Sequence, residues 1–82
     1  MTNTYVVIRQ VASGKEIIVA KEVTRAQAND LAGRELAKLA ADGWDTPTEV
    51  GGYVSILRKR YGTRVHTATV QIRTTEYVYG KS

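Results

Sequence analysis

Apolar and β-branched residues dominate the first part of the chain, in two short segments separated by small residues. Residues 4–12 and 15–23 each have the composition of a strand. Ser13-Gly14 between them suits a two-residue hairpin turn. We therefore predict an antiparallel hairpin in which Ala12 lies opposite Lys15.

That register divides the hairpin into two faces. One face carries four aliphatic residues and is the predicted core, namely Val6, Ile8, Ile17 and Val19. The opposite face carries Tyr5, Val7, Arg9, Val11, Ile18 and Ala20. This second face is unusually apolar for a sheet surface in water, so we expect a partner to cover it.

The next segment has the period of a helix. Thr24 and Gln27 form the sequence pattern of a capping box, which predicts a helix over Arg25–Asp42. Spacings of three and four give one apolar stripe, made of Ala28, Leu31, Ala32, Leu36 and Leu39. Gly33 either allows close approach to the sheet or is a tolerated cost of about 1 kcal/mol. Gly43 suits the left-handed position that ends a helix.

The second half of the chain returns to β patterns. Residues 45–52 are expected to form a loop, 53–60 a third strand, and 64–79 a long fourth strand with a bend or bulge. Gly62-Thr63 suits the turn between the last two strands. The order is ββαββ. We predict an α+β fold with one four-stranded antiparallel sheet and one helix on one of its faces.

The sequence allows two registers for the last two strands. A two-residue turn at Gly62-Thr63 places Leu57 opposite Ala68 and Tyr53 opposite Ile72. A turn longer by one residue places Ile56 opposite Ala68 and Val54 opposite Val70. Because a one-residue slip moves every side chain to the other face, the choice decides which basic residues lie together.

The helix is followed at once by Gly43-Trp44, and later by the strand Tyr53-Val54-Ser55-Ile56-Leu57-Arg58-Lys59-Arg60. Over roughly residues 30–60 this arrangement resembles a family of small uncharacterised bacterial and phage domains. In that family a strand precedes a helix ending in Gly-Trp, and a hairpin with a basic residue follows. Asp45-Thr46-Pro47 departs from the pattern, which has a longer carboxylate and then an apolar strand. The resemblance implies this fold order and no activity. We predict that Trp44 plugs the core between helix and sheet, with ring stacking on a base or ligand as the alternative.

Length and composition set further bounds. The 82 residues, 43% of them hydrophobic and none of them cysteine, predict one domain over residues 1–82 without disulfides or thiolate metal sites. Signal-peptide and membrane-span patterns are not found, so a cytoplasmic protein without membrane contact is expected. A chain this small gains buried area by pairing with itself, and we favour a homodimer.

Charge is segregated in one place. The net charge is +4, and residues 51–74 hold five basic residues and no acidic one. Such a segment favours an anionic partner, and nucleic acid, DNA or RNA, is the preferred one. The candidate contact residues are Arg58, Lys59, Arg60, Tyr61, Arg64, His66 and Arg73. A solvated hairpin tip and an acidic protein partner are the alternatives.

The sheet face opposite the helix is a second candidate surface. In one register it gathers aromatic and basic side chains, namely Tyr5, Arg9, Tyr53, Lys59, Tyr61 and Arg73, as single-strand binders do. Its apolar content favours a homodimer interface instead, with Tyr5, Val7, Val11, Ile18, Tyr77 and Tyr79 as candidates. Tyr77 and Tyr79 would lie on an edge strand. The same face suits an alternative function: a phage- or plasmid-type effector that inhibits a host protein.

Catalysis has little support. His66 is the one histidine, and no motif surrounds Ser13, Ser55 or Ser82. A hard cation near Asp42, Asp45 and Glu49 is less favoured than a solvated loop, because calcium loops need more oxygen ligands. We predict a non-enzymatic protein without cofactor or metal that contacts phosphates largely independently of base sequence.

Overall fold

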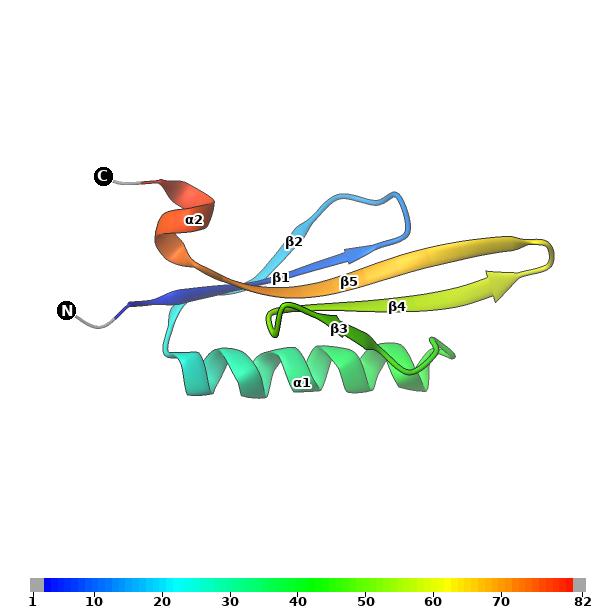
Figure 1. The fold of residues 1–82 in the computed structure, drawn as a ribbon, viewed down its shortest axis with the longest axis horizontal. Helices are drawn as coiled ribbons and strands as arrows, with labels where there is room; N and C mark the ends of the chain where they lie inside the picture. The colour runs from blue at the N-terminus through cyan, green and yellow to red at the C-terminus, as the bar shows by residue number, and fades with distance from the viewer. Residues whose placement is uncertain (1–2, 81–82) are drawn as a thin grey trace.

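The computed structural model describes residues 3–80 as one five-stranded antiparallel sheet with a helix on each face (Figure 1). The long helix α1 lies along one face and the short helix α2 lies on the other. The strand order is β2-β1-β5-β4-β3. The elements are β1 (Tyr5–Val11), β2 (Ile17–Val23), α1 (Arg25–Ala41), β3 (Thr48–Val50), β4 (Val54–Tyr61), β5 (Arg64–Thr74) and α2 (Thr75–Tyr79).

The α+β class with one antiparallel sheet is confirmed, but the predicted ββαββ order lacked two elements. Thr48–Val50, predicted as loop, is the short edge strand β3 and pairs with β4 across a turn at Gly51 and Gly52. The predicted fourth strand ends at Thr74, where the Thr74 hydroxyl accepts a hydrogen bond from the Tyr77 amide and begins α2. Tyr77 and Tyr79 therefore lie on a helix and not on an edge strand.

The register predicted for β1 and β2 holds for Val7, which lies opposite Ala20, but not for the residues nearer the turn. Arg9 pairs with Ile17 and Ile8 with Ile18, and the loop between the strands covers residues 12–16. Ala12 has a left-handed φ of 54°, which bends the chain before Ser13-Gly14. The pairing also shifts twice towards Tyr5, so β2 follows β1 irregularly.

The predicted core face of this hairpin is right for Val19, which packs against the core cluster, but not for the hairpin as a whole. Val7, on the face that was expected to be open, is fully buried in the cluster under α1, and Tyr5 and Val11 pack against that cluster. Ile17 and Ile18 are instead 48% and 43% exposed. Val6 and Ile8 are buried as well, on the other face of β1, which is the side on which α2 lies (Figure 1).

Helix α1 has the predicted start and apolar stripe. Thr24 and Gln27 form both hydrogen bonds of the capping box. The stripe meets the sheet, with Ala28, Ala32 and Leu39 buried and Leu31 and Leu36 packed against the cluster. After the helix, Gly43 takes a φ of 95° and turns the chain, and Trp44 is buried in the core. The predicted role of Trp44 as a core plug is confirmed.

The β4–β5 hairpin adopts the register with the two-residue turn. Leu57 pairs with Ala68 and Tyr61 with Arg64. Leu57 and Ala68 are both buried under α1. Since faces alternate along a strand, Lys59, Tyr61, Arg64 and His66 lie on the α1 side of the sheet, and Arg58 and Arg60 lie on the other side.

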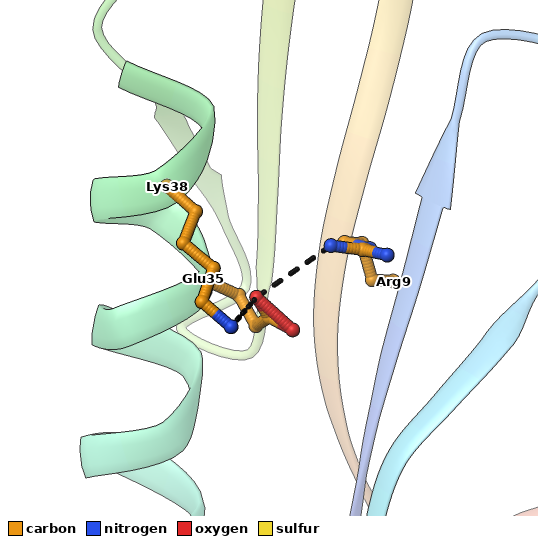
Figure 2. Close-up of polar contacts among 3 residues, drawn as sticks. All are labelled: Arg9, Glu35 and Lys38. Carbon is orange, nitrogen blue, oxygen red and sulfur yellow. Dashed lines mark ion pairs between the residues drawn. The ribbon is translucent and has the colours of Figure 1, made fainter. Parts of the chain in front are cut away.

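A buried ion pair joins α1 to the sheet (Figure 2). Glu35 points from α1 towards β1, and its Oε2 lies 3.7 Å from Nη1 of Arg9. Lys38, one turn along the helix, brings its Nζ to 3.4 Å from the same oxygen. The Glu35 side chain is 7% exposed and that of Arg9 28%. Arg9 was expected on the opposite face; the register change places it under the helix.

Gly33 does not serve close helix–sheet approach, because a Cβ built there meets no atom within 4 Å. Gly33→Ala is therefore expected to raise the free energy of unfolding by about 0.5 to 1 kcal/mol, through lower backbone entropy in the unfolded chain. Urea denaturation measures this change. Unchanged or reduced stability would show that Gly33 is required by a contact or a backbone conformation.

Candidate nucleic-acid interface

The β4–β5 hairpin projects past the end of α1 and past the β1–β2 hairpin (Figure 1). It gives the molecule an elongated shape of 48 × 21 × 20 Å. The projecting part has no carboxylate of its own, because no acidic residue occurs between Gly51 and Thr74. The arm is thus a two-stranded ribbon of uniformly positive charge.

Three arginines of this arm are exposed and unpaired. Arg58 and Arg60 lie on β4 on the side away from α1, and Arg64 begins β5 at the tip. Within residues 3–80 their side chains form no ion pair, hydrogen bond or ring contact. Their guanidinium groups are therefore available to an anionic partner.

Lys59, a predicted phosphate contact, is already engaged. Its Nζ donates to the backbone oxygen of Asp42 at 2.5 Å and lies 3.6 Å from the Asp42 carboxylate. The same Nζ lies 5.2 Å from the ring centre of Tyr61 and 6.0 Å from that of Trp44. A hydrogen bond with Tyr61 and the charge of Asp42 raise the pKa of Lys59 and outweigh its partial desolvation. Lys59 thus fastens the base of the arm to the end of α1, where a cation also complements the helix dipole.

Tyr61 and His66 form a ring pair near the tip. Their centroids are 4.8 Å apart and the rings are nearly perpendicular, at 86°. Tyr61 is exposed and lies on the same face as Arg64, so one side of the arm offers a ring next to a cation.

Arg73 lies apart from the other predicted contacts. It is on β5 opposite Val6, at the end of the sheet where α2 packs. Its guanidinium carbon lies 4.6 Å from the ring centre of Tyr53 and 4.8 Å from that of Tyr77. The structure therefore brings six of the seven predicted residues together in the arm and separates Arg73 from them.

The predicted dimer interface does not form one exposed surface. Tyr5, Val7 and Val11 belong to the face covered by α1, and only Ile18, Tyr77 and Tyr79 of that set are exposed. The single-strand-binding face fails for the same reason, since Tyr5, Arg9 and Lys59 face α1. The effector hypothesis, which named the same face, stays a hypothesis.

Two exposed residues of the arm were missed by the sequence reasoning. Val65 lies opposite Arg60 and Thr67 lies opposite Arg58, so all four share the face away from α1. Strand alternation identifies them once the turn length is known. This face therefore presents two guanidinium groups, a hydroxyl and an aliphatic side chain to the solvent.

The carboxylates that follow α1, at Asp42, Asp45 and Glu49, were the candidates for a hard cation. Asp42 pairs with Lys59, and no group of three or more His, Asp or Glu side chains is placed to hold a metal ion within the described residues. Over that same part of the chain, no helix is long and apolar enough to cross a membrane.

Comparison with protein-family models, with curated proteins and with solved structures found no match for this chain. The resemblance to small bacterial and phage domains thus stays a hypothesis.

Proposed function

We propose that the chain binds nucleic acid through the β4–β5 arm, with Arg58, Arg60 and Arg64 contacting phosphates. The observation that carries the proposal is the exposure of three unpaired guanidinium groups on a projecting ribbon without carboxylates. Unpaired arginines repel one another, and a phosphate backbone removes that repulsion while accepting their hydrogen bonds.

The shape of the arm suggests how it binds. A two-stranded ribbon fits the major groove of duplex DNA, which is about 12 Å wide. Arg58 and Arg60 stand on one face of the ribbon and Arg64 on the other, so the two faces can meet the two phosphate walls of a groove. Phosphate contacts carry no base information, so we expect binding that is largely independent of sequence. Tyr61 next to Arg64 adds a ring for stacking if a single strand is preferred.

Replacing Arg58, Arg60 and Arg64 together with alanine tests the proposal. Three phosphate contacts to duplex DNA contribute a slope of about −2.7 to the salt dependence, or about 40-fold in affinity between about 50 and about 200 mM salt. The triple variant is expected to lose most of that dependence and to bind weakly even at low salt. Fluorescence anisotropy of labelled duplex DNA, single-stranded DNA and RNA across a salt series measures both quantities.

The matched control removes the same charge elsewhere. Lys15, Lys21 and Arg34 are exposed and lie outside the arm, so their triple alanine variant should keep most of the affinity. Equal losses in both variants would reduce the effect to net charge and would contradict a role for the arm. An absence of binding by the unaltered protein at low salt would reject the proposal outright.

A further inference from the structure

Two clefts outside the arm share Tyr53 and Ile72 in their linings. The smaller has a volume of about 170 Å³ and is lined by Tyr5, Arg25, Tyr53, Ile72, Arg73, Thr74 and Tyr77. The larger, of about 310 Å³, runs between α1 and the β3–β4 turn. The larger alone reaches the lower end of the size range of small-molecule sites. Their linings differ in chemistry, and this difference points to the kind of ligand.

The smaller cleft contains a fixed guanidinium. Arg73 lies between the rings of Tyr53 and Tyr77, at 4.6 and 4.8 Å, and its Nε donates to Oε1 of Gln71 at 3.2 Å. Its two terminal nitrogens have no partner among residues 3–80. Ring stacking and the Gln71 bond restrict the side chain, so a ligand that uses these donors loses less conformational entropy.

A second guanidinium lines the same cleft. The guanidinium carbon of Arg25 lies 5.5 Å from the centre of the Tyr5 ring. Its Nε donates to Oδ1 of Asn29 and its Nη2 donates to the backbone oxygen of Gly52. Neither Arg25 nor Arg73 pairs with a carboxylate in the part of the chain that the structure describes. Two guanidinium groups without counterions in one cleft fit a carboxylate or a phosphate.

The larger cleft is apolar at its base. Ala32, Leu36, Val70 and Ile72 line it, with Asn29, Ser55 and Glu49 as polar neighbours. Gly33 also lines this cleft and leaves open space where a side chain would stand. Because Glu49 disfavours a second negative charge there, the charged end of a ligand belongs at the arginines and its apolar part beneath α1.

We propose that the two clefts form one binding site for a small amphipathic anion. Arg73 and Arg25 bind its carboxylate or phosphate, and the larger cleft, beside Gly33, holds its apolar ring or chain. This site is distinct from the arm, so it does not depend on nucleic-acid binding.

Naphthyl phosphate is a suitable probe, with naphthol and inorganic phosphate as its separate halves. Amide NMR titration should show shifts around residues 29–36, 52–55 and 72–77, and each half should bind more weakly than the whole. Arg73→Gln and Arg25→Gln should each weaken binding about tenfold or more. Gly33→Leu should do the same, because its side chain would fill the larger cleft beside α1. Benzoate in place of the phosphate distinguishes a carboxylate preference.

The variants change residues on two different elements, α1 and β5, so misfolding of one variant does not prevent the test of the site. If Arg73→Gln disturbs α2, Gly33→Leu and Arg25→Gln, which change residues of α1, still report on the site. Folded Arg25→Gln and Gly33→Leu proteins with unchanged affinity would overturn the proposal. So would shifts confined to residues 58–66, which would show general anion binding by the arm. The triple arginine variant of the arm should bind the probe normally.

Discussion

Glu35→Ala is expected to lower the free energy of unfolding by about 3 kcal/mol. The carboxylate lies between α1 and β1, 3.7 Å from Arg9 and 3.4 Å from Lys38. Removing it leaves the Arg9 guanidinium under the helix without its counterion. Such an uncompensated buried charge destabilises the fold strongly, unlike replacement of both partners by apolar residues. Arg9 is 28% exposed and keeps some hydration, so we place the loss at the low end of the usual range.

Urea or thermal denaturation measures this loss, and Asp30→Ala is the matched control. Asp30 pairs with Arg34 at 3.2 Å on the same helix, but both side chains are largely exposed, so its removal should cost less than about 0.5 kcal/mol. Replacing Arg9 and Glu35 together with leucine should recover much of the loss. Equal effects of Glu35→Ala and Asp30→Ala would mean that solvent screens the Arg9 pair fully.

Leu57→Ala is expected to lower the free energy of unfolding by about 3 to 4 kcal/mol, which is a large share of the total stability of a small domain. Leu57 is fully buried on β4, next to β5 and under α1. The core cluster that contains Leu57 includes three alanines, at positions 28, 32 and 68, and Ala68 is its strand partner. Such short side chains cannot extend into the space that the substitution leaves, so the cavity term stays nearly complete.

The shift of the denaturation midpoint in urea measures this effect. Val65→Ala serves as the control, because Val65 is on the paired strand but more than half exposed, and its truncation should cost less than about 1 kcal/mol. A small loss for Leu57→Ala would indicate that α1 moves inward to fill the cavity.

The sequence predicted correctly those elements whose ends are marked by local capping or turn residues. The capping box at Thr24 and Gln27 and the glycine turn after the helix located α1. Gly62 and its neighbours located the arm, and the register with Leu57 opposite Ala68 was one of two considered. These features involve residues close together in the chain, where propensity and turn geometry decide the structure.

The faces of β1 could not be predicted in this way. Residues 5–8 are apolar without alternation, and all of them are buried or half-buried, on both faces of the strand. Periodicity fails for such a strand, so the assumed turn alone set the register and shifted it by one residue. Strand β3 was missed because three exposed residues show no period, and α2 because Tyr77-Val78-Tyr79 alternates like a strand.

The charge pattern located the candidate interface but not the residues that are free to bind. Asp42 and Lys59 are far apart in sequence, and only the fold brings them together. Arg73 belongs to the same acid-free segment as Arg58, yet it is on the part of β5 that leads to α2 and two tyrosines. Long-range partners thus decide which members of a basic cluster remain available.

The central position of β1 and β5 in the sheet also bears on when the domain can form. β1 pairs with β5 along its whole length, and the hydroxyls of Thr4 and Thr75 hydrogen-bond at 2.7 Å. During synthesis, β1 therefore has no central neighbour until β5 has left the ribosome. Until then the N-terminal hairpin and α1 lack the strand that lies beside Val7, which is Ile72 and its neighbours on β5. Pairing of β1 with β5 closes the longest stretch of chain between paired strands, and we expect this step to limit the folding rate.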